Sequence, residues 1–513
     1  HKLLYRISVR LVLLYLLLAC FSCHSGTEFA GKEYSLSFFE KTKARSLARQ
    51  HCSSCHLFPK PETLEKETWG YVLGYMGLYL GIEDTTTLKH DAGLIVQWQN
   101  RRNLLKMLKE IPAKPAMKPE EWNLIRKYYI IFAVEKLHYN APRQPELETE
   151  FQLTRLNLKI NDPAITLLDH DQKNLYVGTA WEPRLMVWPI DLHNAPDEPQ
   201  EVIRLPTPPV YLQQINKQLM VTLLGDLLGN RPLEFPASLG EIKNQKFVLI
   251  KDKLPRTAMA LRYLQDWLIP GFGVGRQGNL QLLHEDGSNS ILSEDEGFVS
   301  AHVMNLNDDE QPDILALVAN SRESLRAYLA GAKTFQEIFL QRFDASCGFT
   351  RMKVADLNAD GVPEVVLTAG DNPDAGPYNP PKPCHGVYVY TLHKKPSLSV
   401  KLAYFEPFHG ALDTAIVDLN DDGRMDLVTS TFYPDISRTE PYCLLIMRQQ
   451  NELQFSSTVI SGQYRFSVLK ELTQNGDANV LLSATQLPLV QKIEGENKTQ
   501  NYKTSGLWLL QRR

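Results

Sequence analysis

The chain has 513 residues, of which 43% are hydrophobic and 22% charged, with a formal net charge of -4 at pH 7. This is ordinary globular composition, and the length predicts two or more domains rather than one. So small a net charge excludes an overall positive field that would gather nucleic acid or an acidic membrane surface. No long run of like charge occurs, so we expect no disordered charged tail.

The first residues have the layout of a secretory signal. A short basic stretch precedes an apolar run at 11–18, and the small residue Ala19 and then Cys20 follow. The run is too short to span a bilayer, so we predict a signal peptide over 1–19 and an exported protein. Leu17 to Cys20 resembles a bacterial lipobox, which predicts lipidation of Cys20 and contact with the membrane only through that anchor. The alternative is an ordinary cleaved signal with an incidental cysteine.

Residues 35–140 are predicted to form a small all-α domain. Apolar residues recur at helical spacing over 38–50, 67–80 and 122–136. Pro119 suits the first turn of the last helix, and the two glutamates after it favour its positive N-terminal end.

The segment Cys52-Ser53-Ser54-Cys55-His56 is a C-x-x-C-H motif that follows the first predicted helix. Two thiols at this spacing can form thioether bonds to one haem, and the histidine is then held under the iron as its proximal ligand. The motif therefore predicts one covalent haem c. The alternatives are a redox dithiol, which usually lies in a βαβ context, and half of a zinc site, for which no second pair follows.

A second C-x-x-C-H runs from Cys20 to His24. Cys20 abuts the signal core, so we expect it to be acylated or to lie at the cleavage site. No mature helix could precede this motif, and we expect no second haem.

The sixth iron ligand has two main candidates, since a methionine thioether raises the potential of an electron carrier. Met76 lies in the second predicted helix, and Met117 lies in the proline-rich loop before the last one. Met107 is a third. Each could instead be a core residue, as most methionines are.

Three further cysteines, Cys347, Cys384 and Cys443, are scattered along the second half of the chain. Export makes disulfides possible. Their spacing does not pair them, and one of the three stays unpaired in any case.

After a linker at 140–145, residues 148–513 read as short strands between turn clusters. Three similar units start at 305, 356 and 418, which are 51 and 62 residues apart, and four weaker copies bring the number of units to seven. Periods near 50 residues are typical of propeller blades. We therefore predict an all-β seven-bladed propeller, with six or eight blades as alternatives.

The clear units contain the pattern D-x-[ND]-x-D-G-x-x-[DE], which gathers oxygen atoms in a tight loop of the kind that suits calcium. The loop at 418–426 offers Asp418, Asn420, Asp422, Asp426 and the Arg424 carbonyl. The loop at 356–364 offers Asp356, Asn358, Asp360, Glu364 and the Val362 carbonyl. The third unit has lost its first aspartate and has Glu310 in place of glycine, so we expect weak or no binding there.

These loops are not EF-hands, because they lack a glutamate at position 12 and a β-run follows each of them. The alternative to calcium is a polar turn held by its own Asp and Asn side chains. We expect structural calcium at the two better loops.

The loops and their strands resemble FG-GAP or VCBS repeats, the integrin-like blades of calcium-binding seven-bladed propellers. The helical part is similar to the small cytochrome c domain that precedes such repeats in exported bacterial proteins. The marks of this resemblance are 52–57, the stretch from Trp69 to Ile82 and the segment 121–129. A Trp-x6-Met-Gly element recurs among members of that family, and the resemblance therefore favours Met76 over Met117 as the sixth ligand. The early blades depart from the repeat pattern.

The leading hypothesis is a periplasmic or cell-surface electron-transfer protein. Its propeller would dock a redox partner of the cell envelope, a glycan or another surface protein. No GxSxG elbow, HExxH site or Walker loop occurs. A second hypothesis is a propeller dehydrogenase that passes substrate electrons to the haem, with His385 and Asp371-Asn372 near its site. A third is a non-catalytic adhesion protein.

Overall fold

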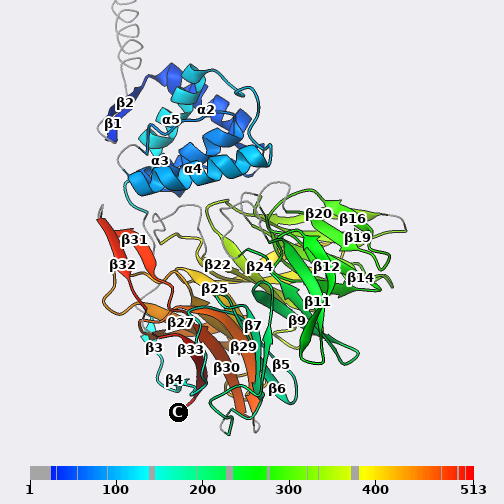
Figure 1. Ribbon diagram of the computed structural model, residues 1–513. Helices are drawn as coiled ribbons and strands as arrows, with labels where there is room; N and C mark the ends of the chain where they lie inside the picture. The colour runs from blue at the N-terminus through cyan, green and yellow to red at the C-terminus, as the bar shows by residue number, and fades with distance from the viewer. Residues whose placement is uncertain are drawn as a thin grey trace, which may run out of the picture. The chain divides into compact units, whose positions relative to one another are not determined.

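The computed structural model covers the whole chain and describes residues 25–513 apart from 30–31, 55, 89–90, 138–144, 193, 227–234, 274–277, 320–321, 333, 371–380, 475–476, 494–495 and 503. It divides into a helical unit ending at Leu137 and a β unit from His138 to Arg513 (Figure 1). The predicted signal peptide, Cys20 and Cys55 lie outside the described residues. Among the helices described, none is long and apolar enough to cross a membrane.

The helical unit contains a β-hairpin as well as helices. Its elements are β1 (Ser25–Phe29), β2 (Lys32–Leu36), α2 (Phe38–Cys52), η1 (Pro61–Thr63), α3 (Lys66–Tyr79), α4 (Ala92–Met107) and α5 (Pro119–Phe132). The prediction of an all-α unit is wrong at its start, because Tyr34 and Leu36 are buried while Ser35 between them is exposed, the alternation of a strand. Helix α4 was not predicted, although Asp91 caps it by accepting hydrogen bonds from Gly93 N and Leu94 N.

Helix α2 begins at a capping box and packs on α5. The Ser37 hydroxyl accepts a hydrogen bond from Glu40 N, and the Glu40 carboxylate accepts one from Ser37 N at 2.8 Å. Small side chains, Ala44 and Ala48, are the buried ones on this helix, and they allow α5 to approach closely. Phe39, one of the apolar residues in the predicted helix over 38–50, is 67% exposed.

Three tryptophans are buried in the helical unit. Each indole N–H has an acceptor: Trp69 donates to Pro61 O at 2.7 Å, Trp98 to Gly74 O at 2.9 Å and Trp122 to an Asp84 carboxylate oxygen at 3.0 Å. A buried tryptophan is costly unless this polar atom is paired. The predicted apolar face of α5 is confirmed, with Trp122, Ile125 and Tyr129 in the core.

The β unit is a seven-bladed propeller, as predicted. The described residues form seven sheets of four or five strands, and within each sheet the neighbouring strands are antiparallel apart from one added parallel strand (Figure 1). Blades 1 to 4 comprise β5 (Ile165–His170), β6 (Asn174–Thr179), β7 (Arg184–Pro189) and β8 (Glu201–Arg204); β9 (Pro209–Ile215), β10 (Gln218–Leu223), β11 (Ala237–Lys243) and β12 (Lys246–Leu254); β13 (Leu261–Tyr263), β14 (Asp266–Pro270), β15 (Leu280–Leu283) and β16 (Asn289–Ser293); β17 (Phe298–Met304), β18 (Asp313–Val318), β19 (Ser324–Ala330) and β20 (Phe335–Arg342).

Blades 5 to 7 comprise β21 (Phe349–Ala355), β22 (Glu364–Ala369), β23 (Gly386–His393) and β24 (Ser399–Pro407); β25 (Ala411–Val417), β26 (Asp426–Thr431), β27 (Tyr442–Asn451) and β28 (Gln454–Ser461) with β3 (Glu146–Leu147); and β29 (Phe466–Gln474), β30 (Asp477–Ala484), β33 (Gly506–Arg512) and β4 (Phe151–Arg155). A hairpin of β31 (Leu489–Ile493) and β32 (Glu496–Gln500) lies between β30 and β33 in the chain.

Strands from the two ends of the β unit close the ring. Strand β4 pairs with β33 as the outer strand of blade 7, and β3 adds to β28 of blade 6. Between them, buried Glu148 accepts hydrogen bonds from Phe151 N at 3.2 Å and Thr458 Oγ1 at 2.5 Å, and it pairs with Arg448 at 2.7 Å. Such closure joins the two ends of the β unit within one blade, as in other propellers built by radial repetition.

The antiparallel blades give the propeller two kinds of loop. Turns between the first and second strands of a blade lie at one end, which we call the turn face. Loops that enter a blade, and those that join its second and third strands, lie at the opposite end, which we call the entry face. The calcium-type loops are on the turn face, and His385 is on the entry face.

Candidate functional site

The C-x-x-C-H motif begins at the last residue of α2. Cys52 is half-buried and packs against the core of the helical unit, which includes Trp69 and Met117. A thioether at this position would therefore sit beside apolar side chains. The second predicted haem cysteine, Cys55, lies outside the described residues.

The His56 ring has a defined orientation. Its Nδ1 lies 2.8 Å from the carbonyl oxygen of Leu57. A carbonyl only accepts, so Nδ1 donates its hydrogen and the lone pair of the neutral ring is on Nε2. A histidine that binds a metal through one nitrogen commonly donates its other N–H to a carbonyl in this way.

The structure separates the methionine candidates. Met117 is buried in the same core that Cys52 packs against, whereas Met76 is half-buried on α3 and is not part of that core. Met107, at the end of α4, is 51% exposed. The chain segments that contain Met117 and Met76 are nevertheless joined by a backbone hydrogen bond, in which Ala116 N donates to Leu80 O at 2.8 Å.

Two glycines in and after the Trp-x6-Met-Gly element are required by close packing of the backbone. A Cβ at Gly77 would lie 2.8 Å from Ile82 O and 3.3 Å from the Trp122 ring. Gly81 has φ +72 and lies against the backbone of the loop at 112–115. Glycine is required where the backbone turns left-handed or another chain segment approaches this closely.

The two better calcium-type loops share one backbone conformation. Their fourth residues, Ala359 and Asp421, both have φ 58, and the glycines at position six, Gly361 and Gly423, have φ 84 and 82. In the third loop, Asp308 at position four pairs with Lys394 at 2.7 Å, so a lysine cation lies beside that turn. Asp308 has φ 63, so the third loop shares the left-handed residue at position four and differs in having Glu310 rather than glycine at position six.

Hydrogen bonds within the loops use the predicted ligand oxygens. Asp418 accepts from Asp422 N at 3.1 Å and from Gly423 N at 2.8 Å, and Asp356 makes the equivalent pair of contacts. This is the pattern of the polar-turn alternative. Across the part of the chain that the structure describes, no three His, Cys, Asp or Glu side chains are grouped so that they could hold a metal ion.

The carboxylates at position nine tie the turns to the blades. Asp426 is fully buried and accepts hydrogen bonds from Leu419 N at 3.2 Å and Gln449 N at 2.9 Å. Burial, together with neighbouring carboxylates, raises its pKa to about 6. Glu364 accepts from Leu357 N at 2.9 Å in the same position of its own loop. These two side chains therefore have a structural role that the ligand pattern did not reveal.

The entry face contains a buried pair of histidines. His385 and His409 are both buried, and their Nδ1 atoms are 3.0 Å apart. Gly410 N approaches His385 Nδ1 at 3.5 Å, so that nitrogen is the acceptor and His409 Nδ1 donates to it. Burial holds the pKa of His385 well below its usual value and lowers the pKa of His409 to about 4. Sequence reasoning named His385 but missed His409, although each precedes a glycine at the entry to a strand.

A disulfide and a lysine brace the same region. Cys347 and Cys384 are bonded, with Cα atoms 5.5 Å apart, and buried Lys382 donates to Ser346 O at 2.9 Å. Both contacts join the loop entering blade 5 to the loop before its third strand. Cys443 remains a thiol whose burial raises its pKa to about 12. Asp371 and Asn372, also named as candidates, lie outside the described residues.

No protein-family model matches the chain, and no curated protein sequence matches it. Among solved structures, the chain is similar to a streptogramin B lyase at 12% identity and TM-score 0.42, over 71% of this chain and 98% of that one. It is also similar to a virginiamycin B lyase from Staphylococcus aureus, at 10% identity and TM-score 0.43 over 71% and 99% of the two chains. The WD40 domain of SCAP from fission yeast matches at 7% identity and TM-score 0.33, over 70% and 97%. These similarities are too distant to bear on function.

Proposed function

We propose that this chain is an exported c-type cytochrome lipoprotein that transfers electrons through one covalent haem held by Cys52, Cys55 and His56. The observation that carries the proposal is the geometry of His56. Its Nδ1 is engaged by the Leu57 carbonyl, which leaves the Nε2 lone pair for a metal. Cys52 lies four residues earlier, against the apolar core. This donor set fits haem c.

When bound, the haem supplies a one-electron couple. The protein's own residues would give it position and surroundings: Cys52 would hold it at the end of α2, Cys55 would supply the second thiol, and the Leu57 carbonyl keeps the His56 ring oriented. The core that Cys52 contacts is apolar and would limit the access of water, which favours the less charged reduced iron. Electrons enter and leave one at a time, with no substrate bond made or broken.

We further propose Met117 as the sixth ligand, with Met76 as the alternative. Met117 belongs to the core that Cys52 packs against, and its loop leads into α5. Met76, which the family resemblance favours, is next to Gly77, and close packing accounts for that glycine. A thioether from either residue would raise the potential.

Calcium belongs to the proposal as a structural ion at the loops 356–364 and 418–426. The shared left-handed turns at positions four and six support it, since they gather the oxygens of positions one, three and five. In this proposal Asp426 and Glu364 tie the turns to the blades. If calcium binds, unfolding in EGTA should occur at a lower temperature than in calcium, and Asp418→Asn together with Asp422→Asn should reduce that difference to the part contributed by the loop at 356–364.

The propeller would serve as the docking platform in the cell envelope, for a redox partner, a glycan or a surface protein. A propeller dehydrogenase is a weaker alternative, because His385 is fully buried and its Nδ1 is engaged by His409. A substrate could reach His385 only after the entry-face loops rearranged. The adhesion alternative differs from the main proposal only in lacking electron transfer.

The test is spectroscopic. The protein is expressed with a working haem-attachment system, purified, and examined as a reduced-minus-oxidised difference spectrum. We expect a low-spin c-type spectrum that Cys52→Ser with Cys55→Ser abolishes. Ser53→Ala, inside the motif but without a haem bond to make, should leave the spectrum unchanged. A folded protein without haem would contradict the proposal.

A further inference from the structure

We propose that a cleft between blades 2 and 3 binds an extended peptide segment with acidic flanks, supplied by a partner protein. This deepens the docking role proposed for the propeller and identifies its surface and ligand. It does not depend on the haem, so the two proposals fail independently.

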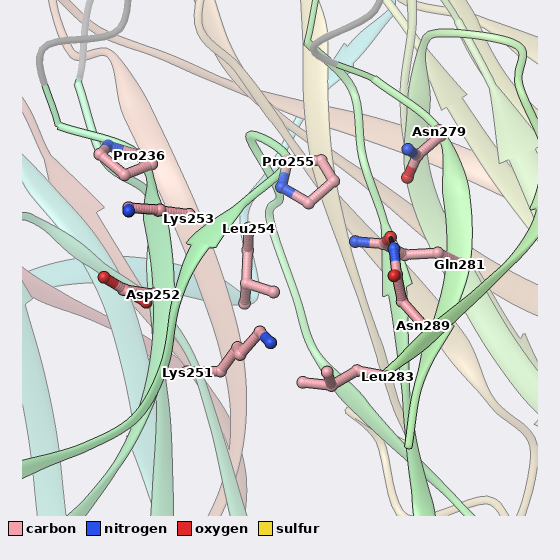
Figure 2. A pocket seen from close by; sticks show the side chains of 10 residues that line it. All are labelled: Pro236, Lys251, Asp252, Lys253, Leu254, Pro255, Asn279, Gln281, Leu283 and Asn289. Atoms are coloured by element: carbon pink, nitrogen blue, oxygen red, sulfur yellow. Dashed lines mark hydrogen bonds between the residues drawn. The ribbon is translucent and has the colours of Figure 1, made fainter. Parts of the chain in front are cut away.

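The cleft has a volume of about 550 Å³. Figure 2 shows Lys251 and Leu254 from β12 on one side, with Gln281, Asn289 and Leu283 from β15 and β16 facing them across the gap. Pro255 and Asn279 line its upper part in that view. The size is in the range of ligand-binding clefts rather than packing defects.

The cleft is lined both by residues of the apolar core between these two blades and by polar side chains. Leu254 and Leu283 belong to that core and also line the cleft. Beyond them the walls are polar: Asn289 Nδ2 donates to Gln281 Oε1 at 2.7 Å, and Lys251 Nζ crosses the gap to Gly287 O at 2.9 Å. Side-chain amides are suited to the N–H and C=O groups of an extended backbone.

One polar atom in the cleft has no partner among the described residues. Asn279 Oδ1 is buried and accepts no hydrogen bond from any residue that the structure describes. A buried acceptor left unpaired costs about 1–3 kcal/mol, so it favours a ligand that brings an N–H donor. A peptide backbone presents such donors at regular intervals.

Beside the cleft, three consecutive apolar side chains are exposed on an outer strand. Val248, Leu249 and Ile250, which directly precede Lys251, are 45%, 52% and 48% exposed. They lie on β12, the outer strand of blade 2, whose far edge pairs with no described strand. Exposed apolar edges of this kind are sites for strand addition. The propeller itself provides the precedent, since β3 adds to the outer strand of blade 6.

The charge of the surface around the cleft indicates that the residues flanking the partner's peptide segment are acidic. The hairpin of β11 and β12 carries Lys243, Lys246, Lys251 and Lys253 against Glu241 and Asp252. The β unit as a whole has the opposite balance, with 35 Lys and Arg against 46 Asp and Glu over residues 138–513. A local basic patch on an acidic propeller selects a partner with carboxylates.

The test measures binding of short fluorescein-labelled peptides to the full-length protein by fluorescence anisotropy. The probe has five alternating valine and threonine residues between pairs of glutamates, and the comparison peptide has lysines in place of the glutamates. We expect the acidic peptide to bind at least about tenfold more tightly, with the preference falling as salt is raised. Equal binding of the two peptides would overturn the proposal.

Variants locate the site. Lys251→Glu with Lys253→Glu should weaken acidic-peptide binding by about tenfold, and Gln281→Leu should weaken it as well. Lys401→Glu, on β24 of blade 5, is the matched control and should leave binding unchanged, since β24 is also a nine-residue outer strand with an exposed lysine.

An unchanged affinity in the variant Lys251→Glu with Lys253→Glu would contradict the assignment. Self-association of the protein that Lys251→Glu abolishes would also overturn it, because the occupant would then be a second copy of the chain. Cys52→Ser should leave peptide binding intact, whatever it does to haem.

Discussion

The Nδ1 atoms of His385 and His409 lie 3.0 Å apart in the interior of the propeller. A single N–H···N hydrogen bond joins the two imidazoles, and both Nε2 atoms are buried with no partner among the described residues. The pair therefore stays neutral in the folded protein. Protonation of either ring would place a charge in a buried site, with buried Lys382 close enough to oppose it.

Stability should fall as the pH is lowered from about 6.5 to about 4, because both histidines have lowered pKa values in the folded state. The unfolded chain takes up protons below about pH 6.5, while the folded pair resists them until lower pH. Each histidine contributes a slope of up to about 1.4 kcal/mol per pH unit. Urea unfolding at several pH values measures this dependence.

Replacing both histidines separates their effect from general acid sensitivity. His385→Gln with His409→Gln should be less stable at pH 7 but should lose less stability on acidification. His393→Gln, at an exposed position, should follow the unmodified protein at every pH. Parallel pH profiles for the double variant and the unmodified protein would show that the buried pair does not titrate as described.

Loss of the Cys347–Cys384 disulfide should destabilise the β unit. The bond closes a loop with a sequence separation of 37 residues, and a bridge of this kind is worth about 2–4 kcal/mol. Cys347→Ser with Cys384→Ser should lower the free energy of unfolding by that amount. A reductant should lower the stability of the unmodified protein to a similar extent and leave the double variant unchanged. A reductant effect of equal size in both proteins would rule out this bond as its cause.

Glu148→Ala should cost about 3–5 kcal/mol, because it leaves the largely buried Arg448 without its main carboxylate partner. The same change removes the acceptor of Thr458 and of two backbone N–H groups at the ring closure. Glu150→Ala is the control, since Glu150 is exposed and 3.9 Å from Arg448. The free energies of unfolding of the two variants, measured by chemical denaturation, should differ by at least about 2 kcal/mol.

The sixth ligand can be assigned by two single substitutions. Met117→Ala should remove the methionine-to-iron charge-transfer band of the oxidised protein and lower its reduction potential. Met76→Ala should keep both, because Met76 lies outside the core that Cys52 contacts. The reverse result would assign Met76 and support the element that the family resemblance favours.

Repetition in the sequence was enough to predict the propeller. The spacing of the units near 305, 356 and 418 carried that prediction, and the weaker blades could still be counted. The disulfide could not be predicted, because Cys347 and Cys384 are brought together by two loops of one blade and their spacing holds no trace of it. The hairpin at 25–36 was missed because its alternation is short and lies close to the predicted signal.

At the candidate sites, the sequence patterns predicted which residue types occur there, but they did not reveal what some of those residues do in the fold. Asp426 and Glu364 fit the calcium pattern, yet both hold backbone N–H groups in the fold. His409 escaped notice because a lone histidine before a glycine carries little signal until the fold pairs it with His385. The cleft beside β12 is lined by residues of two blades, and no local pattern shows that these residues come together.

The most direct test of the electron-transfer proposal is peptide mass spectrometry of the protein made with active haem attachment. Digestion should release a peptide spanning Cys52 to His56 that carries the mass of one haem, joined through both cysteine sulfurs. One haem per chain, and none on the segment from Cys20 to His24, is the result predicted. Free thiols at 52 and 55, or a disulfide between them, in protein made with active haem attachment would contradict it.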